Sequence, residues 1–149
     1  MFGKIKMNNL KDKRVVLIGG AGFIGHNLAL KLKSLGAKVS IIDGMQVNNF
    51  LSLIDNTDNL PHPDLSNAMI MERMRLLREA NVDLKVQDAR NYHAVSNLLT
   101  AINPQVIIHL SAVSHANRSN KDPYSTFDHS FLTLENTLDC ARSTSSNVE

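Results

Sequence analysis

Three glycines between an apolar run and a helical pattern constrain this chain more than any other feature. They stand at positions 19, 22 and 25, directly after the β-branched stretch 13–18. A short apolar run of this kind is typical of a strand buried on both faces. Apolar residues then recur at helical spacing from Ile24 to Leu35. The segment therefore predicts a strand, a tight glycine turn and a helix.

The remaining sequence alternates between strand and helix patterns. Apolar runs predict strands at 38–43, 82–87 and 106–110. Helical periodicity predicts helices at about 64–80, 92–102 and 123–142, and a long polar connection occupies 45–63. In the 64–80 helix, an apolar face is expected at Ile70, Met74 and Leu77, with Glu72, Arg73, Arg75 and Glu79 in solvent. In the last helix, the apolar stripe consists of Phe127, Phe131, Leu134 and Leu138.

Strict alternation of strands and helices predicts an α/β fold. Right-handed crossovers wind such a chain into a doubly wound parallel sheet with helices on both faces. Four strands give the order 3-2-1-4 of an incomplete, Rossmann-like sheet. With 149 residues, we expect one domain over 1–149.

Composition excludes several classes of function. The net charge is +2 without a basic block, so nucleic acid is not expected as a partner. The longest apolar runs are far shorter than the ~20 residues of a membrane span, so no membrane partner is expected either. No secretory signal is recognised, and the single cysteine, Cys140, fits a small buried side chain in a cytoplasmic protein. The six histidines have no metal-ligand spacing, and His109 is expected to be a hydrogen-bonded core residue.

The glycine spacing is typical of dinucleotide binding. Gly19 allows the sharp turn, Gly22 lets backbone N–H groups approach a pyrophosphate, and Gly25 permits close helix packing. Asp43 closes the second strand, where a carboxylate accepts hydrogen bonds from the adenosine ribose. No Arg stands beside it for a 2′-phosphate, which favours NAD over NADP. The alternatives are a glycine connection without a ligand and an ordinary turn aspartate.

Several motifs together resemble the extended short-chain dehydrogenase/reductase family, the NAD-dependent epimerases and dehydratases of nucleotide sugars. The segment 18–25 is similar to the family's TGGAGFIG, and 87–91 is similar to its GDIRD segment. The segment 109–115 resembles HLAA and the loop that lines the dinucleotide. Within the last helix, Ser130 replaces a family Asn.

The resemblance extends the list of cofactor-binding residues. It implies that Asp88 contacts the adenine and that the residues after the fourth strand line the dinucleotide. The full predicted set is Gly19, Gly22, Phe23, Ile24, Gly25, Asp43, Asp88, Ala89, Leu110, Ser111 and Ala112.

The family's catalytic residues have no counterpart in the chain. Its Ser/Thr and its Tyr-x-x-x-Lys pair lie beyond the position matching Glu149, and neither Tyr92 nor Tyr124 has a Lys four residues on. The resemblance therefore implies the NAD-binding part of a nucleotide-sugar epimerase or dehydratase, inactive alone, with a homodimer through the last helix. A non-catalytic dinucleotide-sensing or protein-interaction module, and a reductase of a non-sugar carbonyl, are the alternatives.

Overall fold

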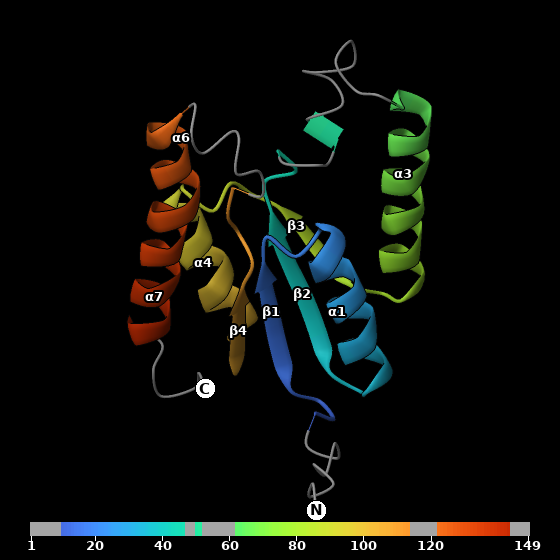
Figure 1. Cartoon of the computed structure of the whole chain (residues 1–149). Coiled ribbons are helices and arrows are strands. Elements are labelled where there is room, and N and C mark those ends of the chain that lie inside the picture. Colours follow the sequence, from blue (N-terminus) through green and yellow to red (C-terminus); the bar gives the residue numbers. More distant parts are fainter. Residues whose placement is uncertain (1–9, 47–49, 52–61, 114–121, 144–149) are drawn as a thin grey trace, which may run out of the picture.

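The chain folds around a four-stranded parallel sheet (Figure 1). The computed structural model describes residues 10–46, 50–51, 62–113 and 122–143. The strand order is β3-β2-β1-β4, which confirms the predicted 3-2-1-4 arrangement. In chain order the elements are β1 (Arg14–Ile18), α1 (Phe23–Ser34), β2 (Lys38–Asp43), α3 (Pro63–Glu79), β3 (Asp83–Val86), α4 (Tyr92–Ile102), β4 (Val106–His109), α6 (Pro123–Phe127), η2 (Asp128–Leu132) and α7 (Thr133–Ser143).

β1 is the central strand of the core. It pairs in parallel with β2 and β4, so that Val16 faces Ser40 on one side and Ile107 on the other. The side chains of Leu17 and Ile18 are fully buried on opposite faces of the sheet. This burial on both faces explains why the strand is apolar throughout rather than alternating.

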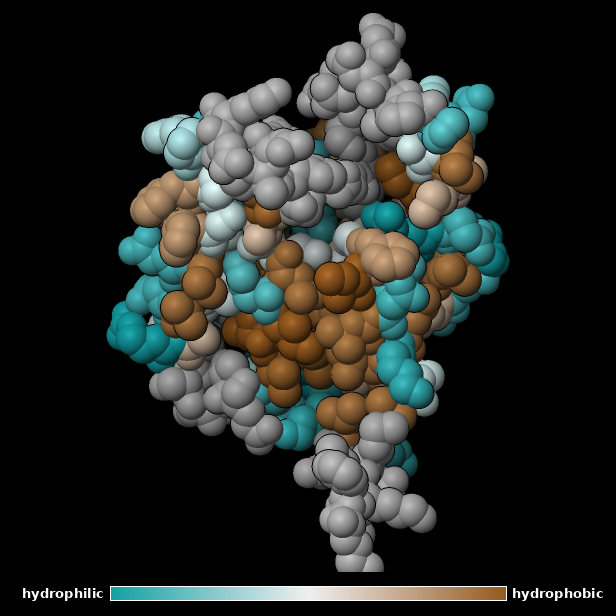
Figure 2. All heavy atoms as spheres, viewed as in Figure 1, coloured by the Kyte–Doolittle hydropathy of each residue, from teal (hydrophilic) through white to brown (hydrophobic). Residues whose placement is uncertain are grey.

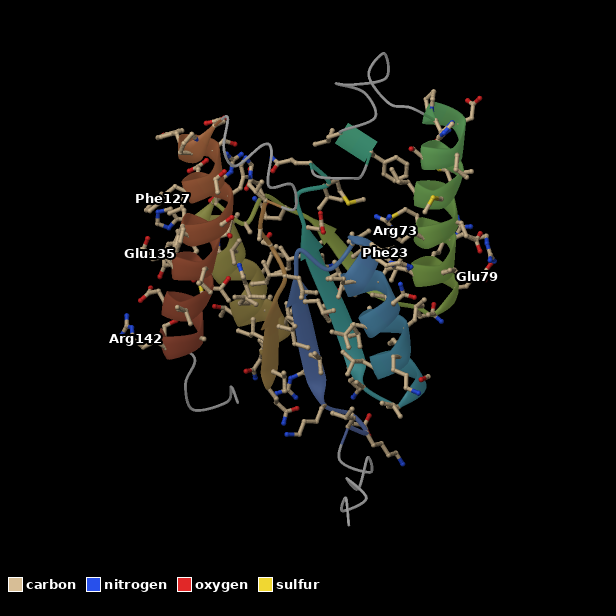
Figure 3. The ribbon with its side chains drawn as sticks, in the orientation of Figure 1. Phe23, Arg73, Glu79, Phe127, Glu135 and Arg142 are labelled. Carbon is tan, nitrogen blue, oxygen red and sulfur yellow. The ribbon has the colours of Figure 1, made fainter. Side chains whose placement is uncertain are left out.

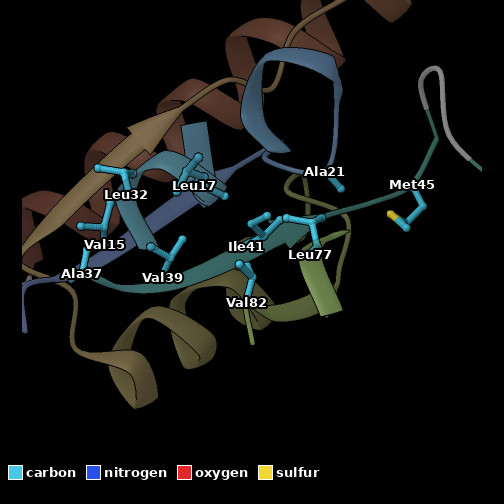
Figure 4. Close-up of a cluster of buried hydrophobic side chains, with 11 residues drawn as sticks. Val15, Leu17, Ala21, Leu32, Ala37, Val39, Ile41, Met45, Leu77 and Val82 are labelled. Carbon is cyan, nitrogen blue, oxygen red and sulfur yellow. The ribbon is translucent and has the colours of Figure 1, made fainter. Parts of the chain in front are cut away.

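The helices cover the two faces of the sheet in pairs. α1 and α3 contribute Leu32 and Leu77 to one buried cluster, which Figure 4 shows around Leu17. α4 and α7 contribute Leu99 and Cys140 to the cluster on the other face. Cys140 is buried, as predicted. The fold is therefore the expected doubly wound arrangement.

β4 lies at one edge of the sheet and is less buried than its neighbour β1. Each of its residues, Val106 to His109, is only half-buried. Val106 and Ile108 pack on the edge of the α1-side cluster, and Figure 2 shows a hydrophobic surface in the centre of the view, to the left of α1 in Figure 1. Among the described strands β4 has a partner on one side only.

Two sequence predictions about side-chain exposure are wrong. Arg73 is expected in solvent, but its side chain is buried because it lies on the face of α3 that also carries Ile70 and Leu77. The apolar stripe of the last helix faces outward, as the labelled Phe127 shows in Figure 3. The inner face of that helix instead consists of Thr133, Asn136, Thr137 and Cys140.

Other segments need only brief description. The last helix is continuous through a π-helical turn, η2, between α6 and α7. Most of the predicted 45–63 connection lies outside the described residues. No helix in the described ranges is both long enough and apolar enough to span a membrane.

Candidate functional site

The carboxyl ends of all four strands converge on one pocket. Its lining includes all eleven residues predicted from the sequence, from Gly19 after β1 to Ala112 after β4. Within the described ranges, four further residues also line it: Gly44, Gln46, His129 and Thr133. In open α/β sheets, ligands bind in the crevice outside the carboxyl ends of the strands.

The three glycines of the turn are required for different reasons. Gly19 has a φ of +75°, and a Cβ on it would lie 2.6 Å from the Ser111 backbone nitrogen. A Cβ on Gly25 would lie 2.5 Å from the Cα of Gly20. Among the described residues, a Cβ on Gly22 would meet only the Gly19 carbonyl oxygen, at 3.8 Å. Packing within the protein thus accounts for Gly19 and Gly25, whereas Gly22 borders space that a ligand's phosphates can enter.

The N-terminus of α1 provides backbone donors at this space. Gly22 is the N-cap residue, and no side chain caps the helix there. The first N–H groups of a helix have no partner within the helix, and the helix dipole favours an anion at that end. Phe23 and Ile24 are exposed and line the pocket beside these donors.

Asp43 holds its carboxylate toward the glycine turn. Its Oδ2 accepts a hydrogen bond from Ala21 N at 2.8 Å, and its Oδ1 accepts one from Met45 N at 2.8 Å. Burial raises the pKa of Asp43, and both hydrogen bonds and the charge of Arg73 oppose that rise. Each carboxylate oxygen keeps a second lone pair that can accept from a ligand hydroxyl.

Asp88 belongs to a network of charges at the far end of the pocket. Arg90 bridges Asp88 and Asp128 with nitrogen–oxygen distances of 2.6 Å to each, and Gln46 donates to Asp88 at 2.9 Å. Burial acts to raise the pKa of Asp88, but the hydrogen bonds from Arg90 and Gln46 outweigh it and lower the pKa to about 2. Asp88 is therefore ionised and held in a fixed orientation.

Polar side chains of the last helix fix the end of β4. His109 Nδ1 lies 3.0 Å from Thr137 Oγ1, so the predicted hydrogen-bonded His109 is confirmed. Burial lowers the pKa of His109, which favours the neutral ring. Ser130, at the position of the family's Asn, accepts a hydrogen bond from Val113 N at 3.2 Å. The last helix therefore holds His109 and Val113 in place, on either side of the pocket-lining residues 110–112.

Four of the lining residues are not among those predicted from the sequence. Gly44 and Gln46 directly follow Asp43 and could have been found by their place after the strand end. His129 and Thr133 are four residues apart, which puts them on one helix face, and Thr133 Oγ1 donates to the His129 carbonyl at 3.0 Å. This four-residue spacing in the sequence could have indicated that both side chains lie on one face of the helix.

Both tyrosines lie away from the pocket lining. Tyr124 is exposed, and Tyr92 donates from its hydroxyl to Asp139 at 2.7 Å. The hydrogen bond to Asp139 raises the pKa of Tyr92. A tyrosine that acts as a base needs a lowered pKa, so Tyr92 is not suited to that role, and neither tyrosine lines the pocket.

Fold and pocket together define a Rossmann-like α/β protein with a glycine turn at its ligand crevice. The family model described as GDP-mannose 4,6 dehydratase matches residues 16–149, and the chain belongs to this family of NAD-dependent epimerases and dehydratases.

Known relatives are similar over most of this chain. A protein named bifunctional UDP-glucose 4-epimerase and UDP-xylose 4-epimerase 3 from Arabidopsis thaliana is 25% identical over 126 residues, 85% of this chain and 32% of its own length. Protein CapI from Staphylococcus aureus is 24% identical over 87% of this chain and 34% of its own length. The UDP-glucose 4-epimerase of Thermus thermophilus, solved with NAD, superposes with a TM-score of 0.65 at 23% identity, over 89% of this chain and 34% of that one. The chain therefore spans about a third of the length of these relatives.

Proposed function

We propose that the pocket binds NAD. The observation that carries this proposal is the open space beside Gly22 at the N-terminus of α1, which the atoms of the described residues leave unfilled. In the proposed complex, the glycine turn holds the pyrophosphate, Asp43 accepts from the adenosine ribose, and Asp88 with Ala89 contacts the adenine. Leu110, Ser111 and Ala112 then line the remainder of the dinucleotide.

The proposed preference is for NAD over NADP. Asp43 would repel a 2′-phosphate, and its two hydrogen bonds hold the carboxylate in place. Arg73 lies near Asp43 but donates to the Ala21 carbonyl, so the guanidinium is directed at the turn.

The wider protein is proposed to act on nucleotide sugars. Support comes from the named activities of the relatives, whose chains are about three times as long as the matched segment. Within the described residues, neither tyrosine reaches the pocket lining. We therefore expect that residues 1–149 supply the dinucleotide-binding part and show no epimerase or dehydratase turnover alone.

Calorimetric titration of the purified chain with NAD and NADP tests this function. We expect saturable binding of NAD, with a higher affinity for NAD than for NADP. The substitution Asp43→Asn is expected to weaken NAD binding. Asp83→Asn is the matched control, because Asp83 is an exposed strand aspartate outside the pocket. Equal binding by the Asp43 and Asp83 variants would contradict the ribose contact, and turnover of UDP-glucose by the chain alone would contradict the expected inactivity.

A homodimer through the last helix is the second part of the proposal. Tyr124, Phe127, Phe131, Leu134 and Leu138 alternate at spacings of three and four residues and are all exposed. An apolar seam with this repeat is the pattern by which two helices pack together. The same stripe fits a second copy of the helix, with Glu135 and Arg142 pointing outward beside it in Figure 3.

A further inference from the structure

Arg73 is a buried cation that lies behind the pocket and not among its lining residues. Its side chain is 7% exposed. Figure 3 shows it pointing from α3 toward the start of α1, whereas Glu79 on the same helix points away into solvent. Its neighbour Arg75 is exposed and pairs with Glu72 and Glu79. A buried guanidinium is costly unless its hydrogen bonds and charge are compensated, so its contacts require an explanation.

One residue of the glycine turn links Arg73 to Asp43. Arg73 Nη1 donates to the Ala21 carbonyl oxygen at 2.9 Å. The N–H of the same residue, Ala21, donates to Asp43 Oδ2 at 2.8 Å. Both polar backbone groups of Ala21 are therefore fixed, one by α3 and the other by the end of β2. These two hydrogen bonds connect Arg73, Ala21 and Asp43. They link the turn that is proposed to bind the pyrophosphate to the carboxylate that is proposed to bind the ribose.

We infer that Arg73 is a positioning residue for the adenosine end of the dinucleotide. Through its hydrogen bond to Ala21, it fixes the orientation of the Asp43 carboxylate and the position of the glycine turn. This inference rests on the proposed function. Nothing in the glycine spacing points to it, because Arg73 lies 30 residues beyond Asp43 and sits on a different element.

The charge of Arg73 has a second effect on Asp43. Burial raises the pKa of Asp43, and the attraction of Arg73 lowers it. Among the described residues, Asp88 and His129 also line this pocket, and Asp88 is paired with Arg90, which lies outside the lining. Removing Arg73 therefore makes Asp43 easier to protonate, and a protonated Asp43 accepts fewer hydrogen bonds from ribose hydroxyls.

Three substitutions separate the hydrogen bond from the charge. Arg73→Gln keeps a donor for the Ala21 carbonyl without the charge, Arg73→Lys keeps the charge, and Arg73→Met removes both. The control is Arg75→Met, which removes an exposed arginine two residues away on α3. Calorimetric NAD affinity is measured for each variant between pH 4 and pH 8. Arg73→Met is expected to weaken NAD about tenfold at pH 7. The pH below which binding is lost is expected to move upward in the Met and Gln variants but not in the Lys or Arg75 variants.

A measurement without ligand separates this inference from the proposed function. The Asp43 carboxyl carbon is titrated by NMR in the NAD-free chain, and exchange of the Ala21 amide is followed in the same samples. The positioning role is supported if Arg73→Met has a higher Asp43 pKa and faster exchange of the Ala21 amide than Arg75→Met. This result supports the inference even if the wild-type chain binds no NAD and the proposed function fails. Where Arg73→Met does not fold, the Gln and Lys variants carry the comparison. Unchanged Asp43 titration and unchanged Ala21 exchange in the Arg73 variants would overturn the inference.

Discussion

Replacing Gly22 tests the proposed phosphate site without disturbing the fold. The backbone of Gly22 is extended, with φ of −75° and ψ of −176°, which any residue adopts. A Cβ there meets no atom of the described part of the chain closer than 3.8 Å. Replacing the N-cap glycine lowers the free energy of unfolding by a few tenths of a kcal/mol or more. The reduced conformational freedom of the unfolded chain raises it by about 0.4–1 kcal/mol. The net change in stability is therefore within about 0.5 kcal/mol. Gly22→Ala and Gly22→Val should therefore fold normally.

The same substitutions should abolish tight dinucleotide binding. The new side chain occupies the space into which a pyrophosphate must come to reach the N–H groups of α1. Loss of those hydrogen bonds costs about 2 kcal/mol, which is about thirtyfold in affinity. Calorimetric NAD titration measures it, and urea unfolding of the same samples reports their stability.

Gly25→Ala is the matched control, because this substitution is expected to lower the stability of the fold. A Cβ at this position lies 2.5 Å from the Gly20 backbone, which cannot rotate out of the way as a side chain can. Overpacking of this kind costs about 1–3 kcal/mol of stability. If a folded Gly22→Val chain binds NAD as tightly as the wild type, the pyrophosphate does not lie at this turn, and the argument from the open space is refuted.

The pocket and the last helix provide three further tests. Asp43→Ala should narrow the affinity gap between NAD and NADP by about 1–3 kcal/mol, measured by titration with both dinucleotides. The depressed pKa of Asp88, about 2 in the folded chain against 3.8 ordinarily, stabilises the fold above pH 4, and this contribution is lost as pH falls toward 2. Arg90→Met should therefore lower the free energy of unfolding by about 1 kcal/mol at pH 6 and by much less at pH 2; an equal loss at both values would contradict the ion pair. If the chain forms the proposed homodimer, Leu134→Glu should shift its sedimentation toward a folded monomer, and a variant that sediments like the wild-type dimer would exclude the outward stripe as the interface.

Local patterns in the sequence were sufficient for most of the fold. β2 and α4 have the predicted bounds, because Asp43-Gly44 and Pro104 mark their ends clearly. The eleven predicted site residues all line one pocket because each follows a strand end, and parallel strands bring those ends to one edge of the sheet. Their binding of a dinucleotide remains a prediction.

Side-chain exposure was harder to predict where polar groups are buried. Asn136 faces inward because its Nδ2 donates to the carbonyl oxygens of Ala89 and Arg90, each at 3.0 Å. A hydrophobic pattern gives such a residue no preference for the interior, so the apolar stripe of the last helix does not mark the face that packs on the sheet. The prediction for Arg73 is wrong for the same reason, since only the tertiary structure supplies the Ala21 carbonyl that it needs.

The close approach of Gly19 to Ser111 has a kinetic consequence. The two residues are 92 positions apart in sequence, yet a single carbon atom does not fit between them. The pocket is therefore complete only after β4 has joined β1, late in any folding route that begins with the local β1–α1–β2 unit. A ligand that recognises the complete pocket cannot assist the earlier steps. NAD should then slow unfolding of the chain in stopped-flow experiments while leaving its refolding rate nearly unchanged.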